Sequence, residues 1–283
     1  MSPVPYNSDA RPGESIVRSV VQSLKWVLVA SGLGCQSIEN DSFPLTLTEA
    51  ARALDEMETT PKKLKRPLVV ATGYLDPGVG SERLANVLRR GLQDDRVIAV
   101  DFFWCARFDE CRDHLIRTVD EAFPTKDPLE TTEVDVVAIS MAGLVAGYAS
   151  QDFPEKGSAS PGRRLLIKRL FTIGAPLRGA RMAEMPSLVP LQLNMRRNSC
   201  FVQTTAEAIS NAGYELYCYT RLGDWVVGSE NTSPPGQAPW WVSTPSFELS
   251  HLGATRDARI QADILRRLRG ESGYATSPPA PLP

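Results

Sequence analysis

The chain has 283 residues, of which 42% are hydrophobic and 23% are charged, and its formal net charge is −2. This length allows one sizeable hydrophobic core, and the near-neutral charge argues against nucleic acid as a partner. We find no internal repeat and no apolar run close to the roughly 20 residues that a membrane-spanning helix needs.

Residues 1–35 have the layout of a secretory signal. Basic residues precede a short apolar stretch, Trp26 to Gly34, and small residues lead into Cys35. This arrangement resembles a bacterial lipoprotein signal, in which the cysteine is lipidated and becomes the mature N-terminus. We therefore expect export, lipidation of Cys35 and attachment to the membrane of the bacterial cell envelope. The alternative is an amphipathic arm on a cytoplasmic protein, because apolar residues between Ile16 and Leu28 also fall on one helical face.

Four cysteines remain besides Cys35, namely Cys105, Cys111, Cys200 and Cys218. An even number would allow two disulfides in an exported protein. The alternative is four reduced and partly buried thiols. Because no C-x-x-C pair is present, we do not expect a zinc site, and we expect no metal.

Two segments flank the expected globular body. Residues 36–66 are predicted to be a lead-in linker that carries one short amphipathic helix at about 48–57, capped by Thr46 or Thr48. At the other end, residues 270–283 are rich in proline and serine, and this composition predicts a disordered tail.

The body between these segments alternates apolar strands with amphipathic helices. The patterns predict strands at about 67–71, 96–101, 134–139, 169–173, 215–219 and 241–246, and helices at about 81–92, 109–123 and 254–268. Such alternation is typical of an α/β fold with a mostly parallel sheet and helices on both faces. Ligands of these folds bind at the carboxyl ends of the strands, so residues that follow strands are the functional candidates.

Ser140 is the first of these candidates. It follows the apolar run Val134–Ile139 and precedes a stretch of small residues that can continue as a tightly packed helix. A strand, a sharp turn with serine at its tip and a helix form a nucleophile elbow, whose usual pattern is G-x-S-x-G. Here Ala138 and Ala142 take the two glycine positions. The alternative is a buried turn that happens to carry a serine.

A serine hydroxyl needs a histidine to take its proton and a carboxylate to orient that histidine. The chain has two histidines. His114 lies within a predicted helix, whereas His251 lies between the last strand and the last helix, so His251 is the candidate base. Asp224 follows the fifth strand and is the candidate acid, with Asp101 and Glu230 as competitors. The order serine, aspartate, histidine along the chain is that of α/β-hydrolases.

Residues 67–269 resemble an α/β-hydrolase of the lipase and esterase kind. The resemblance rests on Thr72–Gly78, on Ala138–Gly143, on Phe171–Ala180, which is similar to the G-x-P-x-x-G segment of many lipases, and on the loops of Asp224 and His251. It implies the α/β-hydrolase fold with a minimal cap. It also implies that the six strands lie in the order 2-1-3-4-5-6, numbered along the chain.

The resemblance further implies an oxyanion hole built from two backbone N–H groups, those of Tyr74 and Met141. Family members usually carry His-Gly before the first of these donors, and this chain carries Thr72-Gly73. Residues 182–195 are dense in leucine and methionine; they are interpreted either as an acyl-chain groove or small lid, or as ordinary packing of a short helix. Three tryptophans are interpreted as rim or as packing residues, namely Trp225, Trp240 and Trp241.

The sequence thus predicts a serine hydrolase that cleaves carboxylic esters, lipid-like ones first, through an acyl-enzyme. We expect catalysis by Ser140, His251 and Asp224, no cofactor, a small-molecule or lipid ester as substrate, and a monomer. One alternative is an acyltransferase or thioesterase with the same three residues. Another is an envelope-anchored binding protein that keeps the fold without turnover.

Overall fold

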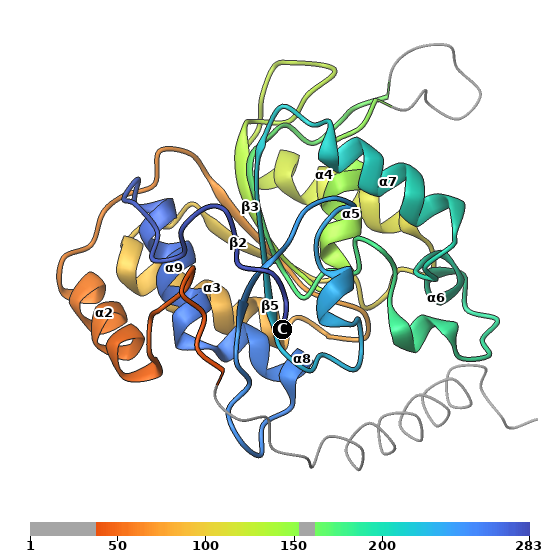
Figure 1. The fold of residues 1–283 in the computed structure, drawn as a ribbon. Coiled ribbons are helices and arrows are strands. Elements are labelled where there is room, and N and C mark those ends of the chain that lie inside the picture. Colours follow the sequence, from red (N-terminus) through yellow and green to blue (C-terminus); the bar gives the residue numbers. More distant parts are fainter. Residues whose placement is uncertain (1–37, 153–161) are drawn as a thin grey trace, which may run out of the picture.

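A computed structural model describes residues 38–152 and 162–283 (Figure 1). The predicted signal segment, with Cys35 as its lipidation site, lies outside the described residues. In the described part no helix is both long and apolar enough to cross a membrane. The four cysteines predicted either to pair or to stay reduced, Cys105, Cys111, Cys200 and Cys218, are all free thiols there.

A six-stranded sheet forms the centre of the molecule, and every neighbouring pair of its strands is parallel. The strands lie in the order β2-β1-β3-β4-β5-β6, so the predicted order is confirmed. Strands covered on both faces can be apolar throughout, and every residue of β1 and β3 is buried. The strands are β1 (Leu68–Ala71), β2 (Val97–Val100), β3 (Val134–Ile139), β4 (Ile167–Ile173), β5 (Glu215–Arg221) and β6 (Trp240–Val242).

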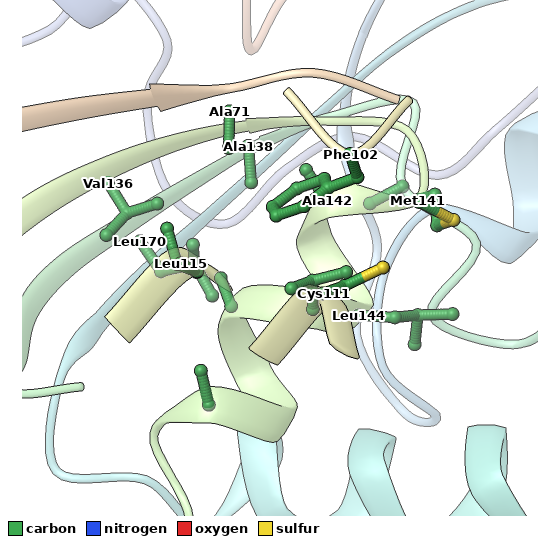
Figure 2. Packing of buried hydrophobic residues seen from close by; sticks show 14 of the residues in the cluster. Ala71, Phe102, Cys111, Leu115, Val136, Ala138, Met141, Ala142, Leu144 and Leu170 are labelled. Atoms are coloured by element: carbon green, nitrogen blue, oxygen red, sulfur yellow. The ribbon is translucent and has the colours of Figure 1, made fainter. Parts of the chain in front are cut away.

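Helices cover both faces of the sheet, as the alternating pattern predicted (Figure 1). One face carries α4 (Phe108–Ala122), α5 (Ala142–Ala149) and α7 (Cys200–Ser210), and the other carries α2 (Leu47–Thr59), α3 (Val79–Leu92) and α9 (Ala258–Leu268). The buried apolar residues accordingly form two clusters, one on each side of the sheet. Figure 2 shows part of the first cluster, where Phe102 and Cys111 pack beside Met141 and Ala142 at the start of α5.

One predicted helix has different bounds in the structure. The helix expected at 254–268 is divided into η3 (Ala254–Arg256) and α9, and a short helix that was not predicted, α8 (Ser250–Gly253), precedes it. The division falls at Asp257, whose side chain accepts a hydrogen bond from the backbone N–H of Arg259 and so begins α9 anew. Small helices between β4 and β5 form the cap region, η1 (Arg181–Glu184) and α6 (Pro190–Asn194); a last short helix, η2 (Ser229–Asn231), follows β5.

The lead-in segment is part of the core rather than a linker. Thr46 caps α2 through a capping box with Glu49. Thr46 is one of the two residues predicted as the cap. Ala50, Ala53 and Met57 are buried in the same cluster as α3 and α9. The boundary predicted before residue 67 is therefore corrected, because the apolar face of α2 completes one side of the sheet.

The prediction of a disordered C-terminal tail is wrong. The backbone N–H of Thr276 donates to the carbonyl of Ser42 at 2.8 Å, and the N–H of Ala280 donates to the Ser42 hydroxyl at 2.9 Å. The indoles of Trp240 and Trp241, on edge strand β6, donate to the carbonyls of Thr276 and Ala280. The tail thus satisfies indole donors that would otherwise be buried without partners, and both tryptophans are packing residues rather than rim residues.

Candidate active site

Ser140 sits at the tip of a strained turn between β3 and α5. Its φ is +53°, a left-handed value that is uncommon for any residue other than glycine. Such a conformation costs on the order of 1–3 kcal/mol and persists only where its surroundings hold it. Two backbone bonds do so here, from Ser140 N–H to the Ile173 carbonyl (2.9 Å) and from Gly143 N–H to the Ser140 carbonyl (3.0 Å).

The tightest approaches around this turn involve glycines outside the predicted alanine pair. A Cβ on Gly73 would lie 2.9 Å from the Cβ of Ser140, and a Cβ on Gly143 would lie 2.5 Å from the Cβ of Ala175. Ala138 pairs with Ala71 on the neighbouring strand, and both small side chains belong to the buried cluster that also includes α5 (Figure 2). The steric demand of the elbow is therefore met at Gly73 and Gly143, and alanine suffices at 138 and 142.

The imidazole of His251 lies between the other two candidate residues. Its Nε2 is 3.1 Å from the Oγ of Ser140, and its Nδ1 is 2.7 Å from an Oδ of Asp224. A neutral imidazole that donates from Nδ1 to the carboxylate leaves Nε2 to accept the serine proton. The structure thus brings together the three residues that the sequence singled out, from the ends of β3, β5 and β6.

Asp224 is held rigidly in a buried turn after β5. Its second oxygen accepts the backbone N–H groups of Val226 and Val227, both at 2.9 Å. Burial alone would raise the pKa of this carboxyl, but the charge and hydrogen bond of His251 and the two backbone donors together lower its pKa below the ordinary value. Asp224 is therefore an ionised acceptor facing the imidazole.

His251 shows the complementary effect. Burial alone would lower the pKa of its imidazole, but the charge of Asp224 and the hydrogen bond to it raise the pKa above its ordinary value of 6.5. Gly174, at φ +60°, borders this pair, because a Cβ there would lie 3.2 Å from the imidazole Nδ1. Gly174 is the first glycine of the G-x-P-x-x-G segment noted in the sequence, but its place beside the imidazole was not predicted.

The competing residues lie elsewhere. Asp101 accepts the backbone N–H of Phe103 at 3.1 Å, and Glu230 pairs with Arg181 at 2.9 Å. His114 lies on α4, where its ring meets Phe102 edge to face. The structure therefore singles out Asp224 and His251 as the carboxylate and imidazole partners of Ser140.

The two expected oxyanion donors come from the two segments that meet at Ser140. Met141 directly follows it, and Tyr74 follows Gly73, whose backbone touches the serine side chain. Within residues 38–152 and 162–283, neither of these N–H groups donates to another protein group. The hydroxyl of buried Thr72 lies 3.1 Å from the Gly73 carbonyl and 3.2 Å from that of Asp76, so the threonine that replaces the usual histidine braces this loop.

Large apolar side chains are exposed in the loops that follow five of the six strands. Leu188 and Phe247 are 95% and 98% exposed, and they are joined by Leu75, Trp104 and Trp225. Because all strands are parallel, these loops lie at the edge of the sheet that carries Ser140. In residues 182–195, Leu191 and Met195 are buried, as the packing interpretation predicts, whereas Met185 and Leu188 are exposed; the interpretation as an acyl-chain groove or lid stays a prediction.

Comparisons with known proteins find two solved structures that align distantly with the chain. No family model and no curated protein sequence matches the chain. A proposed cell surface hydrolase from Lactobacillus plantarum WCFS1 aligns at a TM-score of 0.39 and 13% identity, over 73% of this chain and 92% of that one. A puromycin-hydrolysing peptidase from Mycobacterium tuberculosis aligns at 0.44 and 11%, over 77% of this chain and 36% of that one. Both alignments are too distant to support an inference about the activity of this chain.

Proposed function

We propose that this protein is a serine hydrolase of the α/β-hydrolase superfamily that cleaves carboxylic esters through an acyl-enzyme. The observation that carries the proposal is the continuous series of contacts from Ser140 to His251 to Asp224, with the serine at a left-handed φ. Strain at a serine that also contacts a buried imidazole is costly to keep unless it serves a reaction.

In this reaction the Oγ of Ser140 attacks the acyl carbon while the Nε2 of His251 takes the hydroxyl proton. Asp224 keeps the imidazole in the required tautomer and stabilises its charged form. The N–H groups of Tyr74 and Met141 bind the oxyanion of the tetrahedral intermediate, where each donor is worth about 3–4 kcal/mol by analogy with other hydrolases. His251 then protonates the leaving group, and water, activated by the same imidazole, releases the acid.

The exposed apolar loops favour esters with an apolar acyl or alcohol part. Leu188, Phe247 and Trp104 are exposed in segments that follow strands of the parallel sheet, and ligands of such sheets bind at the carboxyl ends of the strands. We include attachment to the cell envelope through Cys35 and a monomeric state in the proposal, because both fit an enzyme that meets lipid-like esters at a membrane.

The test is labelling of the full chain with a fluorophosphonate, which reacts only with an activated serine. We expect labelling of the wild type, none of Ser140→Ala, and unchanged labelling of Ser150→Ala. Ser150 is a matched control because its hydroxyl makes an ordinary helical bond to the Gly147 carbonyl. A series of p-nitrophenyl esters then measures acyl length. Labelling retained in Ser140→Ala contradicts the proposal, and added thiol or alcohol acceptors distinguish a transferase from a hydrolase.

A further inference from the structure

Arg221 occupies a central place behind the site. It is the last residue of β5, three positions before Asp224, and only 2% of it is exposed. Its Nη1 donates to the carboxylate of Glu248 and its Nε to that of Asp257, both at 2.7 Å. Glu248 precedes His251 by three residues and Asp257 follows it by six. One guanidinium therefore fixes both ends of the segment that carries the imidazole.

The backbone of Arg221 adds two further contacts. Its carbonyl accepts the hydroxyl of Ser229 at 2.9 Å and that of Ser250, the neighbour of His251, at 3.3 Å. The Ser229 hydroxyl also accepts the backbone N–H of Asp224 at 3.3 Å. The loop of the carboxylate and the segment of the imidazole are thus joined through this single residue.

Gly253 shows that the turn of α8 is fitted around the guanidinium. Its φ is −81°, which any residue adopts, so its backbone does not require glycine. A Cβ at this position, however, would lie 2.2 Å from the Nη1 of Arg221 and 3.1 Å from the carboxylate of Glu248. The space of one methyl group is kept open for the contact between these two side chains.

Arg259 provides a contrast within the same cluster. It bonds the carboxylate of Asp257 through Nε and Nη2, at 2.9 and 2.8 Å, and its other contacts are with Ser243. It thus shares the buried carboxylate with Arg221 but has no contact with Glu248. Both arginines compensate the buried charge of Asp257. Only Arg221 also binds Glu248, on the other side of His251.

We propose that Arg221 is a positioning residue that sets His251 against Asp224 and Ser140 by clamping Glu248 and Asp257. The inference rests on the proposed function of the three residues. The α8 turn has only four residues, so it contains few hydrogen bonds of its own. The clamp supplies the missing rigidity, and a shift of even 1 Å in a catalytic group costs up to about a hundredfold in rate.

The test is Gly253→Ala in the full chain, which displaces the guanidinium from Glu248 and removes no charge. We expect kcat on a p-nitrophenyl ester to fall about ten- to a hundredfold, with KM changed less than about twofold. Glu248→Gln, at a half-exposed side chain, weakens the same contact at a surface position and should lower kcat in the same direction. Gly213→Ala, whose added Cβ meets nothing within 4 Å, is the matched control and should keep the wild-type kcat.

A second readout does not depend on turnover. The chain has only two histidines, so NMR titration, with His114→Gln for assignment, follows the pKa of His251 directly. Because Asp224 raises this pKa, a loosened clamp lowers it in Gly253→Ala and in Glu248→Gln. Unchanged kcat and His251 pKa in both variants overturn the inference. A loss of kcat in Gly213→Ala equal to that in Gly253→Ala overturns it as well. A wild type without serine reactivity defeats the proposed function instead, while the titration still decides the role of Arg221.

Discussion

The two ends of β3 hold a buried carboxylate in opposite ways. At its start, Asp135 is fully buried and accepts Arg169 through both oxygens, at 3.0 and 2.5 Å, with Arg66 at 3.5 Å. Beyond its end, the imidazole that contacts Ser140 faces the buried carboxylate of Asp224, which comes from the loop after β5 and also accepts two backbone N–H groups. Both carboxylates are satisfied, but their partners differ in kind.

This difference separates a structural site from one that can do chemistry. A guanidinium is always protonated, so Arg169 cannot accept a proton during a reaction and can only hold Asp135 and the end of α9 in place, where it also donates to the Arg267 carbonyl. An imidazole can gain and lose a proton near neutral pH. The carboxyl edge of the sheet therefore combines a buried charge with a partner of variable charge and a strained serine.

The sharpest way to break the comparison is Asp224→Asn. The amide cannot stabilise the imidazolium and favours the wrong tautomer, so we expect kcat to fall about ten-thousandfold, measured on a p-nitrophenyl ester. The free energy of unfolding should change far less than this loss suggests. Asp101→Asn is the control, since that residue contacts neither His251 nor Ser140, and a larger loss there than at Asp224 would transfer the role of the acid.

The opposite end of β3 is tested by Arg169→Met. Removal of one partner from a buried pair leaves the Asp135 charge largely uncompensated, which costs about 3–5 kcal/mol of unfolding free energy. Urea denaturation measures this loss, and kcat per folded molecule should stay at the wild-type value. Arg90→Met breaks an exposed pair with Glu58 and should cost less than about 1 kcal/mol. Equal losses in the two variants would contradict the buried role of Arg169.

Much of the fold could be predicted because its signals are local. Apolar runs such as Val134–Ile139 stand out from the amphipathic helices around them, and their alternation predicts a parallel sheet. The placing of Ser140, Asp224 and His251 on one edge follows from the same logic, since each comes after a strand and all strands point the same way.

What could not be predicted depends on contacts between distant segments. The tail has the composition of a disordered chain, yet Trp240 and Trp241 bind its carbonyls across more than 35 residues. The clamp of Arg221 was invisible for the same reason, because nothing near Gly253 in the sequence reveals a guanidinium 2.2 Å from its missing Cβ. Composition reports a segment's own tendencies and is silent about which partners the fold brings to it.

The smallest expected effect concerns pH, and it separates activity from stability at the carboxyl edge. His251 must be neutral to accept the serine proton, and its pKa is raised above 6.5, so the acid limb of kcat/KM should lie above pH 6.5 in the wild type. Residual activity of Asp224→Asn should show this limb at lower pH. A profile of kcat/KM between about pH 5 and pH 9 measures both.

The stability that His251 contributes should fall as pH rises, whereas kcat/KM rises with pH over the same range. A raised pKa in the folded state means that His251 contributes stability that is complete below pH 6.5 and is lost as pH rises through the folded pKa. Asp224, whose pKa is lowered from 3.8, contributes stability above that pH and loses it as pH falls further. The pair should therefore add more stability at about pH 5.5 than at about pH 8.5, measured as the difference in unfolding free energy between wild type and Asp224→Asn. A difference that is constant across this range would mean that Asp224 does not shift the pKa of His251, and the contrast with the pair of Asp135 and Arg169 would then disappear.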